Sequence, residues 1–349
     1  MSEAIFYACL GIVLMFIAGN FLVGYFLSAP KYSGPVSGHF DGKRFINPGG
    51  ARAKGFRSVF KWLFTRHPAK RIFVNAPYGE SPMDRIENGL RITFINHSTF
   101  LIQVDGLNFL TDPIWDERAS PFGWVGPKRM RPPGIRFDDL PQIDIVLLSH
   151  NHYDHLNLPT LKKIHQKFHP RIFTSLGVGA FLEKKKIKDE TIEMDWWNKQ
   201  TLSDRLKLTC VPAQHFSGRG MFDRDATLWS GFVLQRKEGN IYFVADTGYN
   251  DSTFKEIRNR LAPIAVAIIP VGAYKPRWFM TAIHTSPEEA VRIHLDVNAK
   301  KSIASHFGTF PLGDDGRDDE MNDLGEALRK FDLSPEEFIV MDEGKGKDF

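Results

Sequence analysis

The residues best suited to chemistry are crowded into residues 149–156, Ser-His-Asn-His-Tyr-Asp-His-Leu. Three histidines and an aspartate follow the spacing H-x-H-x-D-H there: His150, His152, Asp154 and His155. Imidazole is a good ligand for zinc and similar divalent ions, and a neighbouring carboxylate adds a hard, anionic ligand. So dense a group of donors favours a metal site over an ordinary hydrogen-bonded turn.

Short buried strands are the elements expected to position these donors. The apolar, partly β-branched residues 143–148 predict one strand directly before the histidines. Similar runs predict strands at residues 90–95, 100–104, 107–110, 206–211, 242–245, 264–271 and 302–305. Several of these runs end in a histidine or an aspartate, namely Asp112, His150, His215, Asp246 and His306. Because strand ends at one edge of a sheet lie together, these side chains are expected to share one site.

Two helices and a long loop complete the predicted framework. Asn157 is placed to cap a helix over residues 158–168, and Ser286-Pro287-Glu288-Glu289 forms a capping box at the start of another helix. Residues 115–133 form a loop rich in proline, glycine and aromatic residues. A loop of this length in a compact domain is more often functional than idle.

Composition narrows the classes of function. The chain has 349 residues, enough for one large domain or two small ones, and its net charge of +4 gives no reason to expect a nucleic-acid partner. It has only two cysteines, Cys9 and Cys210, and no Cys-x-x-Cys. A disulfide framework is therefore not expected, and the metal site has to be built from histidine and aspartate.

Residues 1–30 are predicted to be a membrane anchor. Residues 4–30 carry no charge and are mostly apolar, long enough to cross a bilayer core of ~30 Å. The alternative is a cleaved secretory signal, which has a basic leader and a shorter apolar core. The leader here contains Glu3 and no lysine or arginine, so we expect an uncleaved, single-pass anchor. Basic residues follow the span, from Lys31 to Arg71, and none precedes it, which predicts that the catalytic part faces the cytoplasm.

Residues 31–85 are predicted to be a linker and a basic amphipathic segment. Residues 31–50 have the proline, glycine and serine content of a linker. Residues 52–66 place Phe56, Val59, Phe60 and Leu63 at helical spacing among basic residues. Such a helix either lies on an anionic membrane surface or docks on the protein core.

The motifs as a whole resemble the metallo-β-lactamase superfamily, in particular its branch of N-acyl-phosphatidylethanolamine-hydrolysing phospholipases D. Beside the histidine cluster, the resemblance covers Thr111-Asp112-Pro113-Ile114, Gly126-Pro127-Lys128-Arg129, His215-Phe216-Ser217-Gly218-Arg219, Asp246-Thr247-Gly248-Tyr249 and His306-Phe307-Gly308-Thr309-Phe310. Two further motifs point to the branch: Pro276-Arg277-Trp278-Phe279-Met280, and His284 followed by Pro287-Glu288-Glu289-Ala290. The chain departs from the family at Asp225, where an asparagine is usual.

The resemblance implies an α/β (α+β) fold, a four-layer αββα sandwich over residues 86–349, with two divalent metal ions, expected to be zinc, at one edge. It implies one ion held by His150, His152 and His215 and a second held by Asp154, His155 and His306. It also implies that Asp246 and a hydroxide bridge the two ions, and that the hydroxide attacks phosphorus.

Other residues are given supporting roles. His284 is a candidate for orienting the phosphate or protonating the leaving alkoxide, the alternative being a structural histidine. Asp112 is expected to hold a ligand histidine, and His97 and Asn96 either do the same or are plain turn residues. Arg129 and Arg277 are candidates for contacting phosphate, with an ion pair or surface charge as the alternative.

The function predicted from these features is hydrolysis of a membrane phospholipid. The resemblance implies cleavage of N-acyl-phosphatidylethanolamine to N-acylethanolamine and phosphatidic acid, so the expected partners are a phospholipid and the membrane surface. One alternative is hydrolysis of another ester: a lactone, a cyclic phosphodiester or a nucleic acid end. The other is a membrane-tethered binding protein without turnover, against which the complete set of ligands argues.

Overall fold

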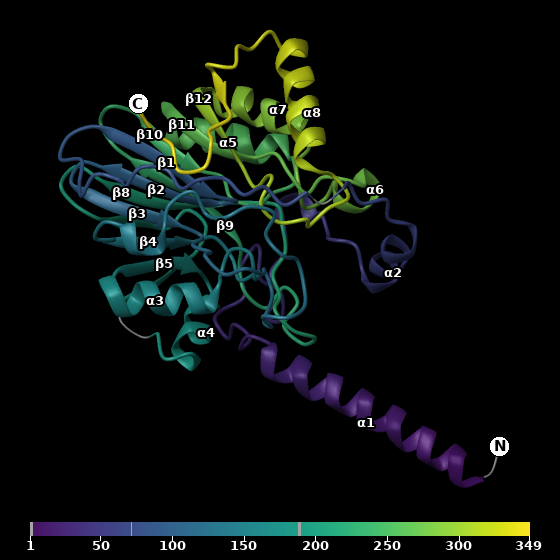
Figure 1. Ribbon diagram of the computed structural model, residues 1–349. Coiled ribbons are helices and arrows are strands. Elements are labelled where there is room, and N and C mark those ends of the chain that lie inside the picture. The colour runs from purple at the N-terminus through teal and green to yellow at the C-terminus, as the bar shows by residue number, and fades with distance from the viewer. Residues whose placement is uncertain (1–2, 71, 188–189) are drawn as a thin grey trace.

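Two seven-stranded sheets form the centre of the protein in the computed structural model, which describes residues 3–70, 72–187 and 190–349 (Figure 1). The first sheet has the order β14-β1-β2-β3-β4-β5-β6 and the second the order β13-β12-β11-β10-β9-β8-β7. The strands of the first sheet are β1 (Leu90–Asn96), β2 (Thr99–Val104), β3 (Leu107–Thr111), β4 (Ile145–Leu148), β5 (Arg171–Ser175), β6 (Thr191–Met194) and β14 (Gly346–Asp348). Those of the second are β7 (Lys199–Thr201), β8 (Lys207–Pro212), β9 (Ser230–Gln235), β10 (Asn240–Phe243), β11 (Ile264–Pro270), β12 (Ala299–Ser305) and β13 (Phe338–Ile339).

The two faces of each sheet are both buried, as the apolar strands require. In β4, Ile145 and Leu147 join the large core that the two sheets share, whereas Val146 and Leu148 join a second core under the helices of the first sheet. Because successive side chains of a strand point to opposite faces, a run of four apolar residues can fill both cores.

Helices cover the outer faces and complete the predicted αββα sandwich (Figure 1). The helices α3 (Leu158–Phe168) and α4 (Val178–Lys184) pack on the first sheet, and α5 (Asp251–Leu261), α7 (Pro287–Val297) and α8 (Arg317–Lys330) lie on the side of the second. Both predicted caps are present. Asn157 accepts a hydrogen bond from the amide of Thr160 at 3.0 Å, and Ser286 and Glu289 form a reciprocal capping box.

The first helix, α1 (Glu3–Leu27), projects away from the sandwich (Figure 1). Its segment Tyr7–Leu27 is long and apolar enough to cross a membrane, by length and composition. Its C-terminal end is fixed to the domain: the Ser28 hydroxyl accepts a hydrogen bond from the amide of Phe222 at 3.1 Å, and the amide of Ala29 donates to Asp223 at 2.8 Å.

Residues 31–50 differ from the predicted linker because they pack on the domain. Phe40 and Phe45 are buried and form a small core with Leu228 and Trp229. Asn47 is also buried, and it bonds the backbone of His215. The glycines and prolines of this segment therefore serve its turns, while its aromatic residues anchor it.

The helix α2 (Phe56–Thr65) is shorter than the one expected over residues 52–66, and one side of it docks on the domain. Val59 and Trp62 pack against the domain, with the Trp62 ring centre 5.1 Å from that of Phe279. The side chains of Phe56 and Phe64, in contrast, are 75% and 86% exposed.

Replacing Phe40 by alanine tests whether residues 31–50 belong to the folded unit. Emptying a buried phenylalanine site should lower the free energy of unfolding by about 3–5 kcal/mol, whereas Val36→Ala, at an exposed position, should change it by less than about 0.5 kcal/mol. Chemical denaturation monitored by tryptophan fluorescence measures both. Equal stabilities of the two variants would contradict the packing and restore the linker interpretation.

Candidate metal centre

The centre is built where strands of both sheets end at one edge. His97 follows β1, Asp112 follows β3, and His150 lies just beyond β4. His215, Asp246 and His306 lie within three residues of the ends of β8, β10 and β12. His97, Asp112 and His306 adopt positive φ angles of 49°, 33° and 59°, an uncommon conformation for such residues that turns the chain sharply as each strand ends.

The first donor group consists of three histidine nitrogens. The Nδ1 of His152 lies 2.9 Å from the Nε2 of His150 and 3.2 Å from the Nε2 of His215. The phenyl ring of Phe216 packs edge-on against the His152 ring, with centres 4.4 Å apart. The three nitrogens therefore face one another in an arrangement that a single cation could share.

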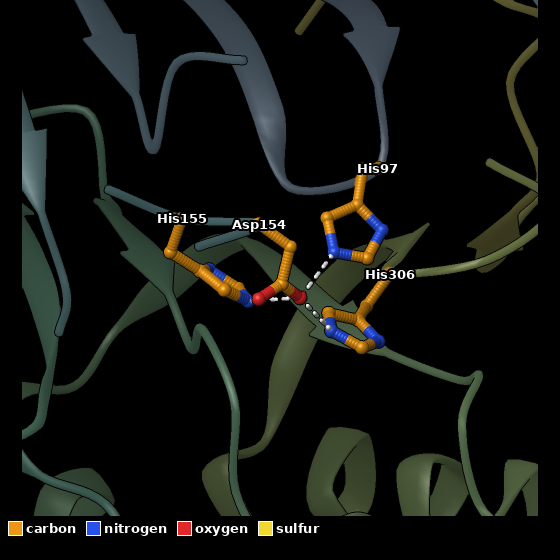
Figure 2. A group of neighbouring side chains, drawn as sticks. All are labelled: His97, Asp154, His155 and His306. Atoms are coloured by element: carbon orange, nitrogen blue, oxygen red, sulfur yellow. Dashed lines mark hydrogen bonds and ion pairs between the residues drawn. The ribbon is translucent and has the colours of Figure 1, made fainter. Parts of the chain in front are cut away.

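The second donor group combines carboxylates and histidines. The Oδ2 of Asp154 lies 3.3 Å from the Nε2 of His155 and 3.5 Å from the Nε2 of His306, so the carboxylate stands between the two rings (Figure 2). The Oδ2 of Asp246 is 3.2 Å from each of the same two nitrogens.

Asp246 connects the two groups. Its Oδ2 also lies 3.6 Å from the Nε2 of His215, a member of the first group. One carboxylate oxygen thus faces donors of both groups.

Unsatisfied polar atoms show that these donors fit divalent cations. The Nε2 atoms of His155 and His306 and the Oδ1 of Asp246 are buried and make no hydrogen bond within the described part of the chain. Buried polar atoms are nearly always paired, and a buried cluster of imidazole and carboxylate donors suits a cation.

The pKa values separate the two donor groups. Burial lowers the pKa of His152 to about 3 and that of His215 to about 4, which leaves their lone pairs free at neutral pH. Burial also disfavours the charged form of His306, but the carboxylates of Asp246 and Asp154 outweigh it and raise the pKa of His306 to about 9. The second group thus attracts positive charge.

Asp112 organises the cluster from behind, in the supporting role expected of it. One of its oxygens accepts from Nδ1 of His155 at 2.7 Å and from the Ser149 hydroxyl at 2.6 Å, and the other accepts from the Ser149 amide at 2.8 Å. The Ser149 hydroxyl is also 2.8 Å from Nδ1 of His150. One buried carboxylate therefore orients histidines of both donor groups.

His97 lies inside the centre, whereas Asn96 is outside it. The Nε2 of His97 is 3.0 Å from Oδ2 of Asp154, and its ring centre is 4.0 Å from that of His306 (Figure 2). Asn96 donates to the carbonyl of Ile114 at 3.2 Å and so supports the neighbouring loop.

His284 faces the centre from the segment before α7. Its Nδ1 is buried, lacks a hydrogen bond in the described chain, and lies 3.9 Å from Oδ2 of Asp246. Arg277 holds this segment in place, because its guanidinium donates to the carbonyl of His284 at 3.0 Å and to Glu289 at 2.7 Å. Arg277 thus forms an ion pair, the alternative role considered for it, and holds the backbone of His284, while its contact with phosphate stays a prediction.

Arg129 binds backbone carbonyls around the loop that follows β3. Its side chain is buried and donates to the backbone carbonyls of Asp116, Arg131 and Ile114. These bonds use three of the five N–H donors of the guanidinium and stabilise the loop over residues 115–133, while the phosphate contact stays a prediction.

Two supporting residues were not predicted. Asn47 accepts from the amide of His215 at 2.8 Å and donates to its carbonyl at 2.7 Å, which fixes this ligand's backbone. Ser149 joins Asp112 to His150, as described above. Its place at the end of a strand, directly before the first histidine, was a usable sign, whereas nothing near Asn47 in the sequence indicates its partner.

The fold and this cluster define a metal-dependent hydrolase of the β-lactamase superfamily. A model of the β-lactamase superfamily domain matches residues 107–307, and the chain belongs to that superfamily. The isothiocyanate hydrolase from Delia radicum gut bacteria shares the fold, with a TM-score of 0.60 at 19% identity over 74% of this chain and 99% of that one.

Two relatives narrow the assignment. The N-acyl-phosphatidylethanolamine-hydrolyzing phospholipase D 1 of Caenorhabditis elegans is 37% identical over 273 residues, which cover 74% of this chain and 76% of that protein. An uncharacterised protein of Mycobacterium tuberculosis is 39% identical over 255 residues, covering 72% of this chain and 67% of that one. The chain is therefore a member of the family that includes this phospholipase D and the uncharacterised mycobacterial protein.

Substituting Asp112 by asparagine tests its organising role. The amide keeps the shape but removes the charge that orients His155, so the affinity for a divalent metal should fall about 10–100-fold. Competition with a coloured chelator measures this affinity, and Asp138→Asn, at an exposed site, is the matched control. If the two variants kept the same metal affinity, the role of Asp112 would be refuted.

Proposed function

We propose that the protein is a membrane-anchored phosphodiesterase that hydrolyses N-acyl-phosphatidylethanolamine to N-acylethanolamine and phosphatidic acid. The observation that carries the proposal is the position of Asp246, whose Oδ2 faces donors of both groups. Two divalent ions about 3.5–4 Å apart neutralise a phosphodiester and lower the pKa of bound water to about 7. The C. elegans relative is an N-acyl-phosphatidylethanolamine-hydrolyzing phospholipase D, which supports this substrate class.

The proposed ligands follow from the two donor groups. His150, His152 and His215 hold one ion, Asp154, His155 and His306 hold the other, and Asp246 lies between them. Zinc is the proposed metal, because a histidine-rich site with a few carboxylates suits it. Asp112 and Ser149 keep the ligand rings oriented, and His97 holds the carboxylate of Asp154 by a hydrogen bond of 3.0 Å.

His284 is the proposed catalytic partner of these ligands. Its ring centre lies 5.0 Å from that of His215 and 5.2 Å from that of His306, at the margin of both donor groups. From there its imidazole, whose pKa burial holds well below the ordinary value, can hydrogen-bond the phosphodiester and relay the proton of the attacking hydroxide to the departing alkoxide oxygen. The hydrogen bond from Arg277 to the carbonyl of His284 holds the backbone that carries this ring.

Membrane attachment is proposed from the two N-terminal helices. The apolar α1 supplies the anchor in residues 1–30, and the basic residues that follow favour a cytoplasmic domain. The exposed Phe56 and Phe64 of α2 would then lie on the bilayer, with Arg57 and Lys61 near anionic headgroups. A phospholipid substrate is thereby kept close to the domain of residues 86–349, to which residues 31–85 connect the anchor.

Hydrolysis of N-acyl-phosphatidylethanolamine in mixed micelles tests the proposed activity. The zinc-loaded full chain should release phosphatidic acid, measured by mass spectrometry, and a chelator should stop the release until zinc is restored. His152→Ala should lower the rate by roughly 10²–10³-fold, the usual loss when a group that stabilises transition-state charge is removed. His67→Ala, which changes an exposed histidine, should keep the rate of the unaltered chain.

The alternatives predict different products. No phosphatidic acid from the metal-loaded chain, together with fast hydrolysis of a lactone or a cyclic phosphodiester, would contradict the proposed substrate. A chain that binds the lipid and metal but turns over none of these esters would indicate a binding protein instead.

A further inference from the structure

A basic pocket lies beside the end of α1, and its lining residues are distinct from the donors of the metal centre. Its volume is about 630 Å³, which is within the range of sites for small ligands. None of its lining residues is a metal ligand. Its charged lining residues are Lys31, Lys43, Arg44, Arg224 and Asp41.

One wall of the pocket contacts α1, and another wall is hydrogen-bonded within the domain. The Phe222 ring, in one wall, lies 4.7 Å from the Phe21 ring of α1, centre to centre. The amide of Tyr32, in another wall, donates to the carbonyl of Ala226 at 3.1 Å. The pocket therefore keeps a constant position relative to the point where α1 leaves the domain.

The pocket carries an excess of positive charge that the protein does not neutralise. Lys31, Lys43 and Arg44 form no ion pair with any carboxylate in the described residues, and Arg224 has only a long contact of 3.9 Å with Asp225. The carboxylate of Asp41 is occupied by backbone amides, those of Lys43 at 2.8 Å and Arg44 at 2.7 Å. These bonds fold the turn and leave the cationic side chains free for another anion.

We propose that this pocket binds the phosphate headgroup of an acidic phospholipid in the membrane that holds α1. The inference rests on the proposed membrane anchoring, because a spanning α1 ends at Leu27 and brings Lys31 to the level of the headgroups. Basic side chains beside a membrane span attract anionic lipids, each contributing to the affinity. A lipid bound here would fix the orientation of the domain on the bilayer.

The pocket also adjoins the metal centre through one side chain. The guanidinium of Arg224 lies 4.8 Å from the centre of the Phe216 ring, and that ring packs against His152. Phe216 follows the ligand His215 in the chain. The headgroup pocket and the first donor group thus share the loop over residues 216–226.

Calorimetric titration of the full chain in neutral detergent micelles tests the proposal. The probes are dioctanoyl-phosphatidylglycerol, dioctanoyl-phosphatidylcholine and inorganic phosphate. The acidic lipid should bind at least about tenfold more tightly than the zwitterionic one, and the double variant Lys43→Glu/Arg44→Glu should lose at least about tenfold in affinity for it. Inorganic phosphate should bind far more weakly than the acidic lipid.

The matched control removes equal charge from a distant surface. Lys300 and Arg329 are exposed on β12 and α8, on the far side of the molecule from α1 (Figure 1), and Lys300→Glu/Arg329→Glu should bind the acidic lipid within about twofold of the unaltered chain. Equal affinity for the two lipids, or equal affinity of the two double variants, would overturn the proposal. Inorganic phosphate that binds as tightly as the acidic lipid would also overturn the proposal. Because binding needs no turnover, an inactive chain that still selects the acidic lipid refutes only the proposed enzymatic function.

Discussion

The burial of three carboxylates at one sheet edge is the constraint on which the rest of the structure depends. Asp112, Asp154 and Asp246 are at most 8% exposed, and isolated carboxylates in such surroundings are very unfavourable. Asp112 is satisfied by hydrogen bonds, but Asp246 leaves an oxygen without one. Positive charge stabilises these buried acids: His306, whose pKa they raise, can supply part of it, and divalent cations would supply more.

The fold makes this concentration of charge possible. Rigid strands from two sheets end at the same edge, so each side chain enters the centre from a different direction. Because these strands are rigid, few backbone rearrangements can relieve the repulsion between the carboxylates. The sharp turns at His97, Asp112 and His306 direct side chains from three of those ends. Asn47 adds a fourth constraint from outside the sandwich by holding both backbone polar groups of His215. The same N-terminal segment continues into α1, so the centre and the apolar helix are joined by a short, well-packed path.

The sequence predicted much of this arrangement, because the signs involved are local. Apolar runs ending in Asp112 or His306 follow from strand periodicity, and the αββα sandwich followed from the family resemblance. The features that the sequence could not predict depend on contacts between segments that are distant in the chain. Glycine and proline made residues 31–50 look like a linker, although the core contact of Phe40 decides their place. Arg129 was a candidate for contacting phosphate, and its bonds to backbone carbonyls could not be predicted, because they lie around a loop without periodicity. The strand β9 was missed because it begins with Ser-Gly.

The central claim is that Asp246 joins two cation sites into one centre. Anomalous diffraction from crystals of the metal-loaded protein, recorded at the absorption edge of the bound metal, measures this most directly. We expect two anomalous-difference peaks, one for each metal ion, about 3.5–4 Å apart. One should lie among His150, His152 and His215, the other beside Asp154, His155 and His306, with Asp246 between them. A single peak, or peaks away from Asp246, would contradict it.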